Sequence, residues 1–219
     1  MKLPFVEKEK SDKKIIRPEN WGWIEKKLDQ SSLDYLWRCI DKKGEKIKDN
    51  LIFAHVDEVY LLLDRGDWFF HHVVEPLALD YEREFGNGLS TSIPVATGHR
   101  WQLGRFWVNY YRSSTYIPLH DHTGIYSFVI WLKIPPRQKI LGKSHHNETH
   151  YNSTFQFYYI DLLGSVRSHT YYLNPEDEGT MVLFPSTLKH CVHPYYCDED
   201  RITISGNIIL NSSTHQKLF

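Results

Sequence analysis

The chain has 219 residues, of which 41% are hydrophobic and 15% aromatic, and its formal net charge at pH 7 is −1. This length favours one domain, and this composition is ample for a buried core, which excludes a globally disordered chain. The near-neutral charge argues against a nucleic acid as partner. The sequence has no apolar run as long as a membrane span and no signal-peptide core at its start, and its three cysteines are irregularly spaced. We therefore expect a cytoplasmic protein that does not enter a membrane.

The N-terminal part of the chain is predicted to flank a core that is built from residues further along the sequence. Residues 1–20 are strongly charged and are expected to be a flexible N-terminal extension. Residues 21–219 are expected to form a single domain, with a helical flank over about 21–88 and a barrel over about 100–212. Trp21 and Trp23 are interpreted as anchors of the extension on that core.

One apolar stripe predicts a helix that begins near Ser31. Leu33, Leu36, Trp37 and Ile40 fall at positions i, i+3, i+4 and i+7, and Ser31 is expected to be the N-cap. The short segment 57–63 that follows is compatible with either a strand or a helix.

A second helical pattern runs from Asp67 to Gly86 and contains Pro76. A proline inside a helix removes a hydrogen bond and clashes with the preceding turn, so we expect a kink or a break there. His71 and His72 lie on this helix and are interpreted as exposed polar residues rather than ligands.

Beyond residue 100 the pattern changes to short strands. Seven or eight strands after two helices predict a mainly β protein with flanking helices, in the form of a barrel or jelly roll. The polar connection 135–152 is expected to be a mobile loop beside the site. The seven strands that the pattern marks most clearly are 101–112, 126–134, 155–161, 169–173, 180–184, 191–195 and 201–210.

Two histidines and a carboxylate stand together just before the apolar strand 126–134. On a strand, residues i and i+2 face the same side, so His120 and His122 are predicted to point at one centre, with Asp121 turned away. Two imidazoles from one strand end supply half of a metal site. A lone His190 follows a later buried strand, and Arg201 and Thr203 then alternate along the last strand.

This order of motifs resembles the 2-oxoglutarate/Fe(II) dioxygenases, in which two histidines and usually a carboxylate hold iron and an Arg-x-Ser/Thr pair holds the far carboxylate of 2-oxoglutarate. The blocks LHDHTGIYSFVIWLKIP and GTMVLFPSTLKHCVHPYY…RITISGNI look most like the prolyl-hydroxylase-like dioxygenases of marine cyanophages. The resemblance implies a cupin-like double-stranded β-helix and a hydroxylase that uses Fe(II), 2-oxoglutarate and dioxygen. For a phage-encoded protein, the expected location is the host cytoplasm.

The chain departs from the family pattern at His122, where the family usually has a carboxylate, and three ligand sets stay open. The alternation favours His120, His122 and His190. Alternatively, His122-Thr-Gly124 corresponds to the His-x-Gly of the aspartyl β-hydroxylases, which leaves iron with two protein ligands. Asp121 is the third option, if the strand end is irregular.

The anchor for 2-oxoglutarate also has alternatives. Arg201, with Thr203 beside it, suits a carboxylate because a guanidinium pairs with it in a bidentate fashion. Lys133 competes with Arg201 if it faces the interior, Asn109 is a weaker candidate, and a structural ion pair of Arg201 with residues 198–200 is the competing explanation. The competing functions are a three-histidine dioxygenase that does not use 2-oxoglutarate and a non-enzymatic phage accessory protein. The sequence does not indicate the primary substrate.

Overall fold

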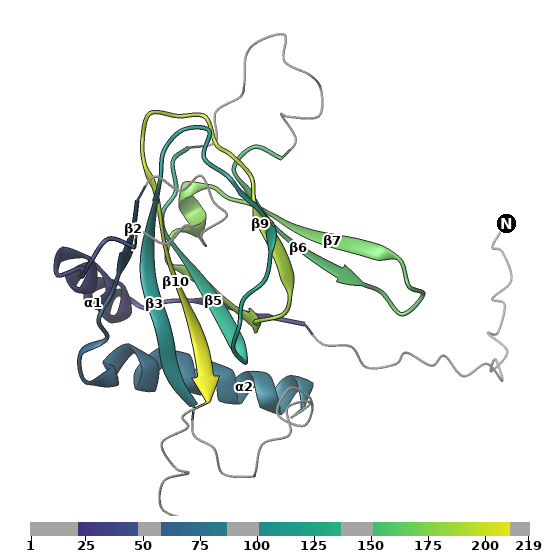
Figure 1. Ribbon diagram of the computed structural model, residues 1–219, viewed down its shortest axis with the longest axis horizontal. Helices are drawn as coiled ribbons and strands as arrows, with labels where there is room; N and C mark the ends of the chain where they lie inside the picture. The colour runs from purple at the N-terminus through teal and green to yellow at the C-terminus, as the bar shows by residue number, and fades with distance from the viewer. Residues whose placement is uncertain (1–21, 48–57, 87–100, 137–150, 211–219) are drawn as a thin grey trace, which may run out of the picture.

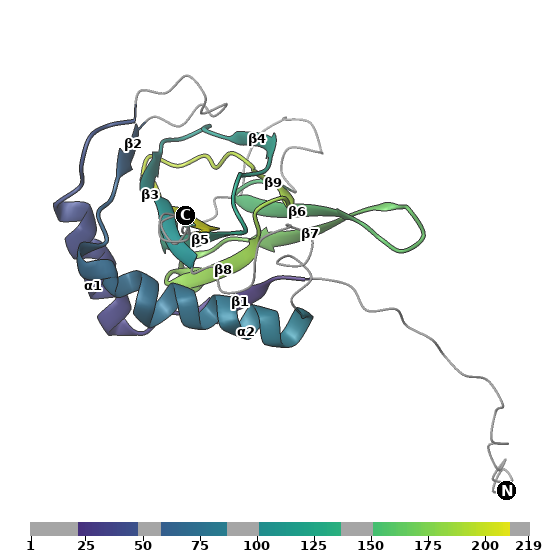
Figure 2. The ribbon, with the colours of Figure 1, turned by 60° about the horizontal axis from the view of Figure 1, so that its bottom comes forward.

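The computed structural model describes residues 22–47, 58–86, 101–136 and 151–210. The expected extension over residues 1–20, and most of the expected loop over 135–152, lie outside these ranges. Within them, strands form two antiparallel sheets and the helices lie on the outer face of the larger sheet (Figures 1 and 2). The jelly roll with flanking helices that the sequence predicts is therefore confirmed.

The larger sheet has six strands in the order β1-β8-β5-β10-β3-β2. All its neighbouring strands are antiparallel, and β10 in its centre pairs with both β3 and β5. The strands are β1 Ile24–Lys27, β2 Glu58–Leu61, β3 Trp101–Tyr111, β5 Tyr126–Lys133, β8 Thr180–Pro185 and β10 Arg201–Leu210.

The smaller sheet has four strands in the order β4-β9-β6-β7. Strands β6 and β7 continue beyond the barrel as a projecting hairpin (Figure 1). The strands are β4 Ile117–His120, β6 Thr154–Ile160, β7 Val166–Tyr172 and β9 Lys189–Val192. Strand β1 is not predicted from the sequence, and β4 is predicted only as the strand end that carries His120.

Two helices form the flank, and each differs from its prediction in one detail. Helix α1, Gln30–Asp41, is capped by Asp29, whose carboxylate accepts the Ser32 backbone N–H at 2.8 Å, so the expected Ser31 cap is wrong. Carboxylates are preferred at this position because they satisfy free N–H groups. In the predicted stripe Leu36 and Ile40 are buried, whereas Trp37 is 38% exposed.

The predicted irregularity at Pro76 takes the form of a π-helix. The chain runs from a 3-10 turn, Arg65–Asp67, through a π-helix, Phe70–Val74, into helix α2, Glu75–Phe85. Pro76 lies in the first turn of α2, where a proline needs no N–H partner. A short 3-10 turn, Pro175–Asp177, precedes β8. His71 and His72 are exposed, as expected.

Alternation along β5 separates two hydrophobic layers. Phe128, Ile130 and Leu132 pack against the helices, while Val129 and Trp131 face the space between the two sheets. Both layers are buried, which explains why β5 is an almost continuous apolar run. Trp23 packs on the inner layer at 4.7 Å from Phe157 and donates to the Tyr171 hydroxyl, which confirms its expected packing on the core, whereas Trp21 and the extension lie outside the described residues.

Candidate metal and carboxylate site

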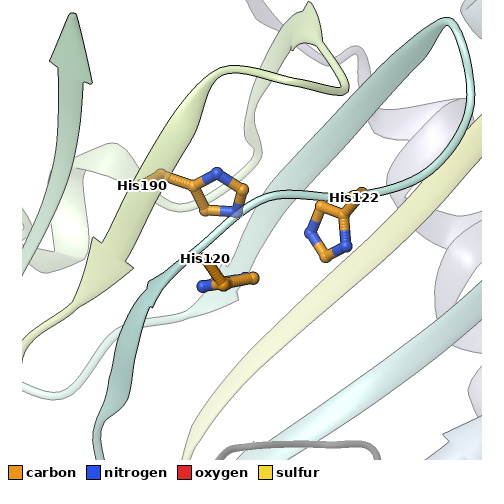
Figure 3. Close-up of side chains that lie close together, drawn as sticks. All are labelled: His120, His122 and His190. Carbon is orange, nitrogen blue, oxygen red and sulfur yellow. The ribbon is translucent and has the colours of Figure 1, made fainter.

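Three imidazoles converge between the ends of β4 and β9. The ligating nitrogens of His120, His122 and His190 all lie within 4.8 Å of one another, and no other such cluster of three occurs among the described residues. Figure 3 shows the rings turned toward a common centre, His190 from β9 and the other two from β4 and the segment after it. The sequence predicts this grouping, and the structure brings the three residues together.

A turn, rather than strand alternation, places His122. Strand β4 ends at His120, so the expected continuous strand is wrong at this point. The His122 backbone N–H donates to the Ser186 carbonyl at 2.9 Å, and that of Ile125 donates to the Ile208 carbonyl at 2.8 Å. Gly124 has a φ of 126°, and a Cβ there would lie 2.8 Å from the Ile208 oxygen. This turn therefore requires glycine.

Hydrogen bonds fix the orientation of two of the rings. Nδ1 of His120 lies 2.9 Å from the Pro118 carbonyl, and Nδ1 of His190 lies 2.8 Å from the Leu188 carbonyl. A carbonyl oxygen only accepts, so each Nδ1 carries the proton and each Nε2 keeps its lone pair. Such a bond is typical of metal-binding histidines, since it sets both the tautomer and the ring orientation.

The surroundings keep the three imidazoles neutral. Burial, with a smaller influence from the neighbouring His120, lowers the pKa of His122 to about 4. Burial also lowers the pKa of His120, and burial together with the nearby imidazole of His120 holds the pKa of His190 well below its usual value. Neutral imidazole is the form that binds metals, so the cluster does not need to lose protons at neutral pH.

Aromatic rings surround the cluster. The His190 ring is 5.0 Å from the Phe184 ring and 5.5 Å from the Phe155 ring, and the Trp107 ring is 6.0 Å from that of His122. This apolar shell explains why burial is the largest influence on the histidine pKa values.

Asp121 and Cys191, the neighbours of the clustered histidines, point elsewhere. The Asp121 carboxylate forms an ion pair with Lys189 at 2.6 Å, in a half-exposed position. Cys191 lies on the other face of β9, with its Sγ 3.4 Å from Nε2 of His193. The structure thus brings neither side chain into the cluster.

Arg201 is fully buried and has no carboxylate partner among the described residues. Its guanidinium carbon lies 4.7 Å from the Tyr111 ring and 4.8 Å from the Tyr195 ring. Its two terminal nitrogens approach the His193 carbonyl only at 3.4 Å, and Nε has no hydrogen-bond partner. Burial lowers the pKa of this guanidinium. A buried cation without an anion is costly, and this one has unused donors.

The other predicted anchor residues separate into two groups. Thr203 and Asn109 are buried beside each other, and the Asn109 amide donates to the Thr203 hydroxyl at 3.1 Å. Lys133 is 42% exposed at the end of β5 and pairs with Glu199 at 3.4 Å. The ion pair considered for Arg201 is thus absent among the described residues, whereas Lys133 has a carboxylate partner.

Part of the chain matches the model of a known protein family. Residues 105–207 match the model of a family described as "Putative 2OG-Fe(II) oxygenase". This region contains the three histidines, Arg201 and Thr203. The match and the histidine cluster together support Fe(II), 2-oxoglutarate and dioxygen as cofactors, as the sequence predicts. No curated protein sequence is matched.

Several solved structures share this fold at low sequence identity. A prolyl-4-hydroxylase from Pseudomonas putida has a TM-score of 0.53 at 14% identity, covering 88% of this chain and 94% of that one. An oxidoreductase of the 2OG-Fe(II) oxygenase family from Burkholderia pseudomallei has a TM-score of 0.51 at 12% identity, covering 83% and 79%. The α-ketoglutarate-dependent epimerase SnoN from nogalamycin biosynthesis has a TM-score of 0.54 at 12% identity, covering 86% and 78%. The likeness to cyanophage enzymes stays a prediction.

Two contributors to the site have little signal in the sequence. Tyr195 lies in the connection between β9 and β10, and only its place between His190 and Arg201 could have marked it. Trp107 is one of several aromatic residues on β3, and the alternation of that strand puts it on the same side as Asn109 and Tyr111. Among the described helices, none is long and apolar enough to cross a membrane.

Proposed function

We propose that this protein is an Fe(II)/2-oxoglutarate-dependent dioxygenase that hydroxylates its substrate and releases succinate and carbon dioxide. In this proposal His120, His122 and His190 hold the metal and Arg201 holds the distal carboxylate of 2-oxoglutarate. The observation that carries it is the presence, in one barrel, of a neutral three-imidazole cluster and a buried guanidinium that lacks an anion.

The two features belong to the same interior. Thr203 pairs with Trp131 across β10 and β5, and Trp131 packs in the inner layer with Phe155 and Phe184. Those two phenylalanines contact the His190 ring. A ligand that bridges the cluster and Arg201 would therefore lie within the barrel, between the two sheets.

Each residue has a defined task. Fe(II), when bound, supplies the redox chemistry that couples decarboxylation of 2-oxoglutarate to oxidation of the substrate by dioxygen. His120 and His190 present bare Nε2 atoms, and none of the three neutral imidazoles needs to lose a charge-carrying proton before it binds the metal. Arg201 pairs with the distal carboxylate and so sets the direction in which the 2-oxo acid approaches the cluster. Thr203, held by Asn109, adds a hydroxyl beside it, and the aromatic shell limits access of water.

A three-nitrogen set is the ligand choice that the geometry favours. Asp121 is engaged by Lys189, and His122 is held in place by the turn that requires Gly124. The same set also fits a metal-dependent dioxygenase that does not use 2-oxoglutarate, which is the second candidate function. Arg201 separates the two, because that enzyme would have no need of a buried cation without an anion.

The deciding experiment measures 2-oxoglutarate binding and turnover. Protein loaded with Mn(II) or Co(II) should bind 2-oxoglutarate in calorimetry, and Fe(II)-loaded protein should form succinate when a substrate panel is added. Because the fold is shared with a prolyl-4-hydroxylase, peptidyl proline is the first substrate to include, beside nucleobases and small molecules. If the loaded protein binds no 2-oxoglutarate at millimolar concentration, the second candidate replaces the first.

A further inference from the structure

The contacts of Arg201 stabilise its charge without occupying its hydrogen-bond donors. Aromatic rings attract a cation through their faces, so Tyr111 and Tyr195 partly replace lost water. Neither ring accepts a conventional hydrogen bond from the guanidinium. Its nitrogens keep only the long contacts to the His193 carbonyl, and Nε keeps none. The donors therefore stay available to a carboxylate.

The hydroxyl oxygen of Tyr195 links the end of β3 to the start of β10, where Arg201 lies. The Tyr195 hydroxyl donates to the Tyr111 backbone carbonyl at the end of β3 and accepts the Arg201 backbone N–H at 3.1 Å. The same side chain thus sets the start of β10 through its hydroxyl and contacts the guanidinium through its ring. Tyr195 is 2% exposed, so water does not readily replace these bonds.

The segment that carries Tyr195 is itself fixed to neighbouring loops. The His193 N–H donates to the Thr154 carbonyl at 2.9 Å, and the Pro194 carbonyl accepts the Ser153 N–H at 2.9 Å. The Tyr195 carbonyl accepts the Ser114 N–H at 2.8 Å. Three consecutive residues between β9 and β10 are held by backbone bonds, which gives the tyrosine a rigid base.

We propose that Tyr195 is a positioning residue that presets Arg201 for the distal carboxylate and so makes the site select 2-oxoglutarate over 2-oxo acids that lack this group. The inference rests on the proposed function. Tyr195 acts through Arg201 rather than by touching the reacting atoms. A loose arginine would reach a carboxylate only after adopting one of many conformers, whereas a fixed one meets it directly.

The test compares two ligands of equal chain length on Co(II)-loaded protein. 2-Oxopentanoate carries a methyl group where 2-oxoglutarate has its distal carboxylate. The dissociation constant of 2-oxopentanoate divided by that of 2-oxoglutarate therefore measures the preference that the anchor alone provides. Tyr195→Phe removes two hydrogen bonds, of which only the one from the Arg201 backbone N–H holds the arginine directly. The ratio should therefore fall in this variant by roughly 2- to 12-fold, the usual net effect of one hydrogen bond. Its affinities for 2-oxopentanoate and for Co(II) should match those of the wild type. Tyr196→Phe, the same change one residue along, should leave the ratio intact.

The outcomes separate the two levels of the proposal. If wild-type protein binds neither ligand, the proposed function fails and this inference with it. If wild-type protein prefers 2-oxoglutarate but Tyr195→Phe keeps the full preference, or weakens both ligands equally, the role of Tyr195 fails and the proposed function stands.

A second variant covers the case in which Tyr195→Phe does not fold. 3-Fluorotyrosine at position 195 keeps the shape and the hydroxyl, and its ¹⁹F signal should move when 2-oxoglutarate is added but not when 2-oxopentanoate is added. A signal that responds to both ligands alike, or to neither, would overturn the inference.

Discussion

His120 and His190 face each other in register across β4 and β9, with their ring centroids 4.2 Å apart. Strand pairing therefore fixes the separation of two candidate ligands. Their Nδ1 bonds to backbone carbonyls fix the ring orientations as well. The metal would thus enter a site that is formed before it arrives, which lowers the cost of ordering the ligands on binding.

Replacing His190 with alanine should abolish stoichiometric metal binding. His190 is the most buried member of the cluster, and two remaining imidazoles cannot complete a three-nitrogen face. Calorimetry with Mn(II) or Co(II) measures this directly. His72→Ala, on the exposed face of the π-helix, is the matched control and should bind metal like the wild type.

The choice of third ligand can be tested on the adjacent pair. Asp121→Ala should keep full metal binding, because its carboxylate is engaged by Lys189, whereas His122→Ala should weaken binding. The reverse pattern would make Asp121 the ligand. Unchanged affinity in both variants would instead leave His120 and His190 as the two protein ligands and would exclude the His-x-Gly arrangement that begins at His122.

Arg201→Ala should weaken 2-oxoglutarate binding by roughly 30- to 5,000-fold. Loss of a buried charge-paired contact costs on the order of 2–5 kcal/mol, at about 1.4 kcal/mol per tenfold change in affinity. Metal affinity should be nearly unchanged. Lys133→Ala, which removes a half-exposed cation paired with Glu199, should have little effect. A large loss in Lys133→Ala together with none in Arg201→Ala would move the anchor to Lys133.

Gly124→Ala should lower metal affinity through the backbone. The new Cβ would meet the Ile208 carbonyl oxygen, and the turn that positions His122 would have to shift. A disturbed ligand support typically lowers metal affinity by roughly 10- to 100-fold. Gly164→Ala is the control, because Gly164 also has positive φ but a Cβ added there would meet nothing within 4 Å. Equal metal affinity in the two variants would contradict the role of the turn.

Acid should destabilise the metal-free protein below pH 6.5. Histidines in the unfolded chain titrate near this pH, whereas burial lowers the pKa of His122 to about 4 and that of His190 well below its usual value. Between these values the unfolded state binds more protons, so the contribution to stability is complete above pH 6.5 and falls toward pH 4.

Urea unfolding at a series of pH values would measure this effect. The decline between pH 6.5 and 5 should be shallower in His190→Gln, which removes one of the groups. A free energy of unfolding that does not change over this range, or a decline that is the same in His190→Gln, would show that the buried imidazoles are not its source.

The fold was accessible from the sequence because its main strands are long and carry clear patterns. Strands β3, β5 and β10 all match their predicted ranges closely. The short strands β1 and β4 carry too few residues for a periodic signal, and their existence depends on pairing with distant strands. The cap of α1 was misassigned because Asp29 and Ser31 are both good capping residues, and only the geometry distinguishes them.

The candidate site was predicted in part, because its histidines lie at the ends of strands that the sequence marks clearly. The grouping of His120, His122 and His190 follows from their places at strand ends, and the structure brings them together. The sequence could not show that a turn, rather than alternation, aims His122, because this depends on the contacts of Gly124 with β10. Nor could it show that Glu199 pairs with Lys133 and leaves Arg201 alone, since such a choice between carboxylates is made by the tertiary structure.

The alternation of β9 also decides which residues would be damaged when turnover occurs without substrate. The Cys191 sulfur lies on the opposite face of the strand from the His190 ring, so the backbone separates it from the cluster. Aromatic rings, those of Phe155, Phe184 and Trp107, lie beside the histidines. On the proposed function, idle enzyme should therefore acquire oxygen on aromatic side chains before it forms oxidised cysteine. Peptide mass spectrometry would measure this as added oxygen on the three aromatic residues, which should increase with the amount of turnover that occurred without substrate.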